Sequence, residues 1–171
     1  MTDITKLAML LLTLTVTGCA STVTISPAGD VHSADLGFYA KLPPGSTPWE
    51  AVSYQRGEVM FQRAGDPGRM SVYVTRGDPK NTGPVRVDIN VMFRRFKDRE
   101  TLEIRSVEVA GQPAVFQDWT AKADGVPMRI NTCVLACNHV TYDLAAWAPE
   151  KDFDPIAAEF AQFLRSFSIE R

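Results

Sequence analysis

The stretch VPMRINTCVLACNHVTYDLAAW (residues 126–147) decides the fold that we expect for this chain. Two runs rich in apolar residues, 126–135 and 140–147, are separated by a short break that contains Cys137. Two such runs around a break of a few residues predict a β-hairpin. Residues 126–147 are therefore expected to supply the last long antiparallel pair of a β-sheet.

Shorter strands are predicted on the N-terminal side of this hairpin, because alternating apolar residues there are bounded by glycine and proline. Residues 37–42, for example, end at a Pro-Pro-Gly breaker at 43–45. The apolar residues of the run 102–109 change phase near Ser106, which predicts a β-bulge. The expected strands cover residues 37–42, 49–54, 58–62, 70–74, 102–109 and 114–121.

Two helices are predicted among these strands. Between residues 84 and 97, apolar residues recur with the spacing of one helical face. The second helix begins near Phe153-Asp154-Pro155, which offers a hydrophobic staple, an N-cap acceptor and a proline at the first helical position. An antiparallel β-sheet flanked by helices is an α+β domain. The buried stripe of the second helix is expected to contain Ile156, Phe160, Phe163, Leu164 and Phe167.

The N-terminus has the features of a secretory signal, with Lys6, an apolar run over residues 7–16 and then small residues. The run is shorter than the roughly 20 residues that a membrane-spanning helix needs. The segment Val-Thr-Gly-Cys at 16–19 resembles the lipobox of bacterial lipoproteins. The resemblance implies a diacylglycerol thioether on Cys19, cleavage before it and an acylated amino terminus. A plain signal peptide with an incidental Cys19 and a retained anchor are the alternatives.

This resemblance sets the expected domain organisation and location. Residues 1–18 are the signal peptide, 19–34 the lipidated cysteine with a polar tether, and 35–171 a single domain. Two or more acyl chains hold a protein durably on a membrane. Because Ala20 and not an aspartate follows the cysteine, we expect the bacterial cell envelope, on the outer membrane facing the periplasm.

Assigning Cys19 to lipid leaves Cys133 and Cys137 as an even pair in an oxidising compartment. A tight hairpin turn would let their side chains face each other and form a disulfide, with a gain at the low end of about 2–4 kcal/mol. Two free thiols are the second interpretation. A metal site that adds His139 is the third, although a structural zinc site needs one ligand more.

The order of motifs in the mature chain resembles the PsbP/Mog1 fold, which several bacterial lipoproteins of the DcrB type share. The resemblance rests on the Pro-Pro-Gly after a short strand, a mid-chain helix, the segment Val-Ala-Gly-Gln-Pro-Ala at 109–114, a long hairpin and a closing helix that ends at Ser166-Phe167. It covers residues 36–170 and implies a PsbP/Mog1-like α/β/α sandwich. It implies no catalytic or binding residue, because functions on one fold differ by site.

Few side chains are placed for catalysis. His139, Thr141 and Asp143 share one strand face by the period of two. They would suit a general-base pair, although a surface histidine in a hairpin is the favoured interpretation. The glycines form no phosphate-binding loop, and Asp118, Asp124, Asp152 and Asp154 form no calcium-binding run.

Three tryptophans and one basic cluster are further candidates for binding. Trp49, Trp119 and Trp147 are interpreted as core residues, with a groove for an apolar or sugar ligand as the alternative. The cluster of Arg94, Arg95, Lys97 and Arg99 is interpreted as a solvated helix face, with anionic lipid headgroups as the alternative. A net charge of −2 without a basic patch gives no indication of nucleic-acid binding.

The lipid anchor, tether and compact domain together predict a non-catalytic binding or assembly module that presents one face to an envelope protein partner. The alternative is a small-ligand carrier with a pocket between the sheet and the helices. We expect no enzyme activity, no metal and no cofactor. An envelope enzyme would need His139 to converge with a carboxylate and a nucleophile.

Overall fold

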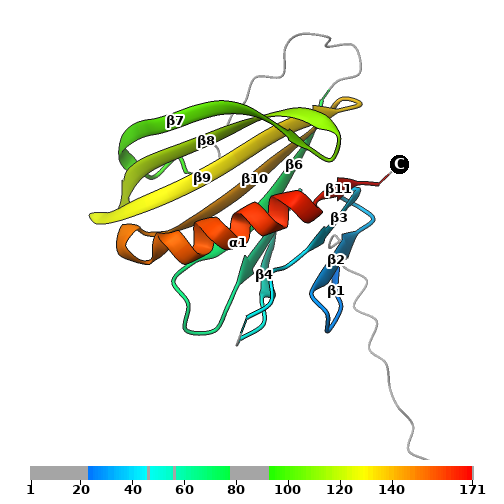
Figure 1. Cartoon of the computed structure of the whole chain (residues 1–171), viewed down its shortest axis with the longest axis horizontal. Coiled ribbons are helices and arrows are strands. Elements are labelled where there is room, and N and C mark those ends of the chain that lie inside the picture. The colour runs from blue at the N-terminus through cyan, green and yellow to red at the C-terminus, as the bar shows by residue number, and fades with distance from the viewer. Residues whose placement is uncertain (1–22, 46, 56, 78–92, 171) are drawn as a thin grey trace, which may run out of the picture.

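The computed structural model describes residues 23–45, 47–55, 57–77 and 93–170. Within these residues the chain forms antiparallel strands followed by one α-helix near the C-terminus (Figure 1). The elements are β1 (Val23–Ile25), β2 (Asp30–Ser33), β3 (Phe38–Lys41), β4 (Glu50–Gln55), β5 (Glu58–Gln62), β6 (Arg69–Arg76), β7 (Lys97–Val109), β8 (Gln112–Ala123), β9 (Val126–Cys137), β10 (Val140–Pro149), the 3-10 helix η1 (Glu150–Asp152), α1 (Phe153–Ser166) and β11 (Ser168–Ile169).

An antiparallel sheet of seven strands in the order β4-β5-β6-β10-β9-β8-β7 forms the body of the domain. The predicted hairpin is confirmed: β9 and β10 pair from Cys137 with Val140 to Met128 with Pro149. Asn138 and His139 connect them with φ angles of 49° and 63°. Positive φ at both positions of a two-residue turn is the type I′ geometry, whose twist matches that of the strands.

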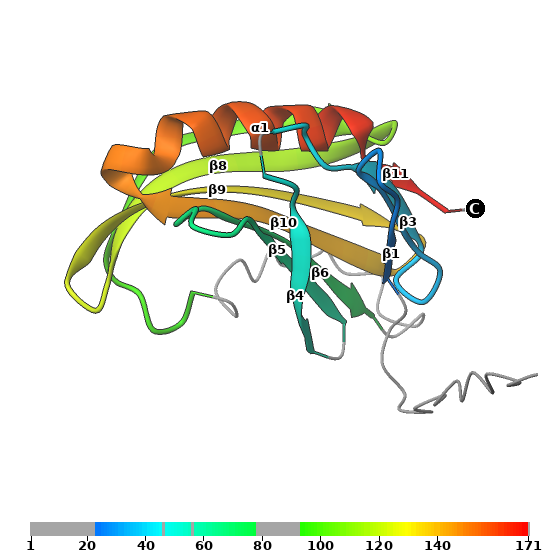
Figure 2. The same ribbon diagram turned by 90° about the horizontal axis from the view of Figure 1, so that it is seen from below.

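Side chains of this sheet alternate between a helix face, covered by α1, and a distal face on the opposite side. On β10, Tyr142 and Leu144 belong to the helix face, whereas Asp143 and Ala145 belong to the distal face. The helix lies along the helix face (Figure 2). It buries most of the predicted stripe, at roughly 1.5–3 kcal/mol for each large apolar side chain. The fully buried members are Ile156, Phe160, Phe163 and, beyond the helix end, Phe167.

A sheet flanked by helices overstates the architecture, because the described residues contain one α-helix and one 3-10 turn. The other expected helix, over residues 84–97, lies outside the described residues as far as residue 92. Its last part is a turn, after which Lys97 begins β7. The expected N-cap at Asp154 is wrong, since α1 continues from η1 and has Asp152 at its N-cap without a side-chain hydrogen bond. A chain that enters through a 3-10 turn is already helical at Asp154, so that residue caps nothing.

A small sheet in the order β1-β2-β3-β11 contains residues that were expected to be a tether. β1 pairs with β2, so the folded domain begins no later than Val23. The prediction of a polar tether over residues 19–34 is therefore wrong from residue 23 onward. The Ser26 hydroxyl accepts hydrogen bonds from the backbone N–H groups of Ala28 and Asp30. The small polar residues therefore build a tight turn here, because a serine hydroxyl can replace a backbone acceptor.

The edge strand β7 is longer and less regular than predicted. Its pairing with β8 shifts between Thr101 and Glu103, and is continuous from there to Val109. The bulge expected at Ser106 is therefore misplaced. Ile104 and Val107 are three positions apart, so their side chains lie on opposite faces of the strand. Ile104 faces the distal side, whereas Val107 faces α1.

Candidate functional site

A groove opens between α1 and the outer strands of the helix face, with a volume of about 310 Å³. We call it the α1 groove. Its apolar walls include Val107 on β7, Phe116 on β8 and Phe160 on α1. On the same side of the helix, Ala157 and Ala161 also line it. A methyl group is too short to reach the sheet from these positions, which leaves the space open.

Asn131 is a buried amide that lines the α1 groove, with 5% of its surface exposed. Its Nδ2 atom donates one long hydrogen bond, of 3.4 Å, to the carbonyl oxygen of the preceding residue Ile130. An amide side chain has two donor hydrogens and two acceptor lone pairs. Most of the hydrogen-bonding capacity of Asn131 is therefore available to a bound molecule.

Two arginines lie at the border of the α1 groove. Arg165 is exposed in the last turn of α1 and forms no ion pair with the described residues. The guanidinium of Arg105 lies 4.2 Å from the ring centroid of Phe116, and its Nε lies 3.2 Å from Glu103 Oε1. That ion pair is half exposed and so is worth at most about 1 kcal/mol. With Glu108 as the carboxylate of the lining, the groove border carries a net positive charge.

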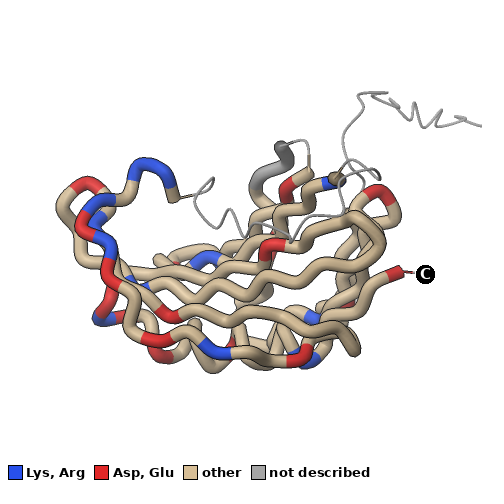
Figure 3. Tube along the Cα trace, turned by 90° about the horizontal axis from the view of Figure 1, so that it is seen from above, with Lys and Arg blue, Asp and Glu red and all other residues tan. Residues whose placement is uncertain are grey.

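A second feature is an exposed apolar patch at the β7 edge, which we call the edge patch and define as Leu102, Ile104 and Val115. Their exposed fractions are 48%, 64% and 36%. Ile104 and Val115 are diagonal neighbours on the distal face, because Ile104 pairs with Gln117 and Ser106 with Val115. Residues of both charge signs lie along β7 on either side of this patch (Figure 3).

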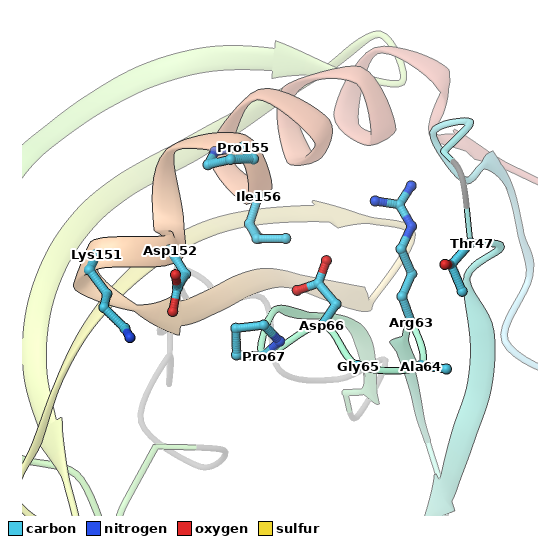
Figure 4. A pocket seen from close by; sticks show the side chains of 10 residues that line it. All are labelled: Thr47, Arg63, Ala64, Gly65, Asp66, Pro67, Lys151, Asp152, Pro155 and Ile156. Atoms are coloured by element: carbon cyan, nitrogen blue, oxygen red, sulfur yellow. The ribbon is translucent and has the colours of Figure 1, made fainter.

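A hollow of about 440 Å³ lies where α1 begins, between the β5–β6 connection and η1 (Figure 4). Side chains of both charge signs line it, among them Asp66, Lys151 and Asp152. Asp66 has a structural role, since its Oδ1 accepts the N–H of Gly68 at 2.7 Å. Because the lining carries both charge signs and Asp66 is already hydrogen-bonded within the protein, this hollow favours no single class of ligand.

Arg63 borders the same hollow but is bound to α1. Its Nη1 donates to Glu159 Oε1 and Oε2 at 2.6 and 2.8 Å, and its Nη2 donates to the carbonyl of Pro43 at 3.0 Å. Trp49 stacks under the guanidinium at 4.6 Å and donates from Nε1 to Glu159 at 3.1 Å. A Cβ at Gly45 would lie 2.6 Å from Arg63 Nη2, so a side chain there would have to displace the guanidinium.

The predicted disulfide is wrong, because Cys133 and Cys137 are both free. β9 continues through Cys137, which places the two cysteines four positions apart on one strand. Four residues of strand span about 13 Å, whereas a disulfide needs Cα atoms within about 7 Å. Burial raises the pKa of Cys133 to about 12, which makes it an inert core thiol.

The grouping of His139 with Thr141 and Asp143 does not hold. His139 lies in the type I′ turn, where the strand period of two does not apply, and its carbonyl accepts the N–H of Gly77 at 2.8 Å. Across residues 23–77 and 93–170, apart from positions 46 and 56, no group of three or more His, Cys, Asp or Glu side chains is placed to hold a metal. Asp118 pairs with Arg129 at 2.6 Å.

The core interpretation of the tryptophans is confirmed for Trp49 and Trp119, which are 3% and 4% exposed. Trp119 and Trp147 lie on β8 and β10, with β9 between them. Phe93 contacts both rings edge to face, at centroid distances of 5.1 and 5.3 Å. The two rings therefore belong to an apolar cluster on the distal face, and the alternative of an aromatic groove does not hold.

Glu58, Arg63 and Asn131 are among the buried polar residues of the described chain that no sequence pattern predicted. Burial raises the pKa of Glu58. The burial of Arg63 could have been predicted from the alternation along β5, because Arg63 continues the series of Val59 and Phe61 on the helix face. A polar side chain in the buried phase of a strand needs a partner or a ligand.

The signal peptide (1–18) and Cys19 lie outside the described residues. The part of the chain that the structure describes contains no helix with the length and hydropathy required to cross a membrane.

No family model and no curated protein matches the sequence. Among solved structures, cyanobacterial PsbP (CyanoP) from Synechocystis is 13% identical with a TM-score of 0.61, over 90% of this chain and 95% of that one. LpqN, involved in cell envelope biogenesis of Mycobacterium tuberculosis, is 12% identical with a TM-score of 0.53, over 83% and 90%. A Bacteroides thetaiotaomicron protein is 10% identical with a TM-score of 0.58 over 89% of this chain, which spans 49% of its length. At these identities the likeness shows the fold, which is PsbP-like.

Proposed function

We propose that this protein is a non-catalytic binding or assembly module of the bacterial envelope, comparable to lipoproteins of the DcrB type and held on the membrane by lipid on Cys19. The observation that carries the proposal is the edge patch. Charged residues and β-bulges on long edge strands prevent pairing with other chains, and β7 has both. Leu102 and Ile104 are nevertheless exposed there beside Val115, as on a surface that is covered by a partner.

The anchor would hold the folded domain close to the membrane. Four Cα–Cα steps separate Cys19 from Val23, where the folded domain has already begun, and they span at most about 14 Å. Two or three acyl chains, a diacylglycerol and an amide-linked palmitate, would give durable attachment. With Ala20 after the cysteine, the location that we propose is the outer membrane, facing the periplasm.

Crosslinking in membranes tests the partner. The full-length protein would be crosslinked, purified and compared with Ile104→Asp, and with Val52→Asp as the matched control. Val52 is 40% exposed on β4 at the other edge of the same sheet. We expect the crosslinked envelope protein to be lost with Ile104→Asp and kept with Val52→Asp. Equal capture by both variants would overturn the docking surface.

Acyl labelling tests the anchor. Cys19→Ser should abolish incorporation of a labelled fatty acid and leave an unlipidated product. Continued labelling of this variant would contradict lipidation at Cys19.

A second candidate function, a small-ligand carrier, is favoured by the α1 groove. Its volume of about 310 Å³ lies at the lower end of the ~300–1,000 Å³ of ligand sites, and apolar walls with few polar groups are typical of them. The groove lies between the sheet and the helix, where a carrier would hold its ligand.

A further inference from the structure

We infer that the α1 groove binds a single-chain amphiphile with an acidic headgroup, a carboxylate or a phosphate. The inference rests on the carrier function proposed above and names its ligand. The acyl chain lies against Phe116 and Phe160, and the headgroup lies at Arg165.

The walls of the groove suit an alkyl chain. Phe116 and Phe160 line the groove from the sheet and from the helix, and they are 8% and 1% exposed. Most of its accessible apolar surface therefore comes from the more exposed Ala157, Ala161 and Leu164 on the helix. Ala157 and Ala161 are one helical turn apart on the side that faces β7, so the space between helix and sheet follows the helix axis. A groove of about 310 Å³ accepts one alkyl chain better than two.

The charge of the border selects the headgroup. Arg165 has no ion-pair partner among the described residues, and Arg105 has an exposed pair with Glu103 that an anion can replace. One carboxylate, from Glu108, opposes these two guanidinium groups in the lining. Arginine suits carboxylate and phosphate oxygens because its donors form a planar fork.

Asn131 gives the groove a second polar contact. Only 5% of its surface is exposed, and its hydrogen bond to the carbonyl oxygen of Ile130 is marginal at 3.4 Å. A buried amide with unused donors is costly unless a ligand or water pairs with it. An ester or headgroup oxygen of the amphiphile would accept from Nδ2.

Photocrosslinking of the full-length protein in phosphatidylcholine vesicles tests this ligand. The probe is a twelve-carbon carboxylic acid with a diazirine in its chain, and labelled peptides are identified by mass spectrometry. We expect labelling on α1 and on β7–β8. Competition by dodecanoate or by dodecyl phosphate supports the inference and tells the two headgroups apart. Equal competition by dodecanol and dodecylamine would overturn the acidic headgroup.

Two variants and one control keep the result independent of folding. Arg165→Glu should lower labelling by the acid at least about fivefold and raise labelling by the matching amine probe. Ala161→Phe should fill the groove and suppress both probes, whereas Ala158→Phe, at an exposed position outside the groove lining, should label like the wild type. Unchanged labelling of Ala161→Phe would overturn the site.

The two proposals fail separately. Absence of acid labelling together with loss of the crosslinked partner in Ile104→Asp would remove the carrier and keep the assembly module. Specific acid labelling without any partner would do the reverse.

Discussion

At the scale of single residues, Arg63 and Glu159 join the β5–β6 connection to α1. Their side chains are 9% and 19% exposed, and Trp49 and the carbonyl of Pro43 satisfy further donors and acceptors of the pair. Removing one partner of a buried pair leaves an uncompensated charge. We expect Glu159→Gln to lower the free energy of unfolding by about 3 kcal/mol, as measured by urea denaturation.

The double variant Arg63→Met/Glu159→Leu provides the control. Because no charge is left unpaired, its loss should be smaller than the sum of the two single losses. Additive losses would mean that the pair does not act as a unit.

Glu58 makes stability depend on pH. Burial raises its pKa, so the folded state binds the proton more tightly than the unfolded chain does. Its favourable contribution is fully present below the unfolded pKa and is lost as the pH rises through the folded pKa. Glu58→Gln should therefore raise the free energy of unfolding at pH 7, by about 1 kcal/mol, with little change at pH 4. Denaturation at the two pH values checks this, and a loss at pH 7 would contradict it.

The cysteines give a direct chemical test of the register of β9. Thiol titration of the unfolded, unreduced protein should find both Cys133 and Cys137 free. In the folded state Cys137 should react first, because Cys133 is 0% exposed and has a pKa of about 12. Finding no free thiol would mean that the strand register near the turn differs.

At the scale of elements, the β9–β10 hairpin depends on its turn. Asn138 and His139 both have positive φ, which asparagine tolerates and histidine tolerates less. We expect His139→Gly to raise the free energy of unfolding by up to about 1 kcal/mol, and Asn138→Val to lower it by about 1–2 kcal/mol. Thermal unfolding measures both, and the opposite order of stability would argue against a type I′ turn.

Elements with a strong local pattern could be predicted, and those without one could not. The alternation in residues 126–147 and the helical stripe of α1 are properties of contiguous residues. β1 and β2 were missed, because three or four residues of mixed polarity around Ser26 also fit a linker. A pocket between the sheet and the helices was the alternative prediction, and no residue was assigned to it. Ala157 and Ala161 are ordinary helix residues until the sheet opposite them is known.

At the scale of the whole molecule, Phe167 attaches the small sheet to the large one. Its ring lies 5.3 Å from Phe38 on β3 and 5.6 Å from Tyr142 on β10, measured between centroids. The Ser166 hydroxyl adds a bridge, accepting the N–H of Lys41 at 2.8 Å. The two sheets are therefore coupled through the end of α1.

Phe167→Ala should uncouple them. We expect a loss of about 3–5 kcal/mol and faster hydrogen exchange in β1, β2 and β3 than in β8 and β9. Tyr39→Ala, which removes an aromatic ring that is 43% exposed on β3, is the matched control and should cost less. Equal acceleration in both sheets would show that they unfold as one unit.

The sequence by itself determined the long hairpin, the buried stripe of α1 and the order of the main strands, because these depend on side-chain periodicity within short segments. The tertiary structure alone decided that β6 lies beside β10, that the two cysteines lie on one strand, that Arg63 meets Glu159, and that an open groove separates α1 from β7. Each of these depends on register between residues that are distant in sequence. Such register is fixed by how whole elements pack, which no local pattern contains.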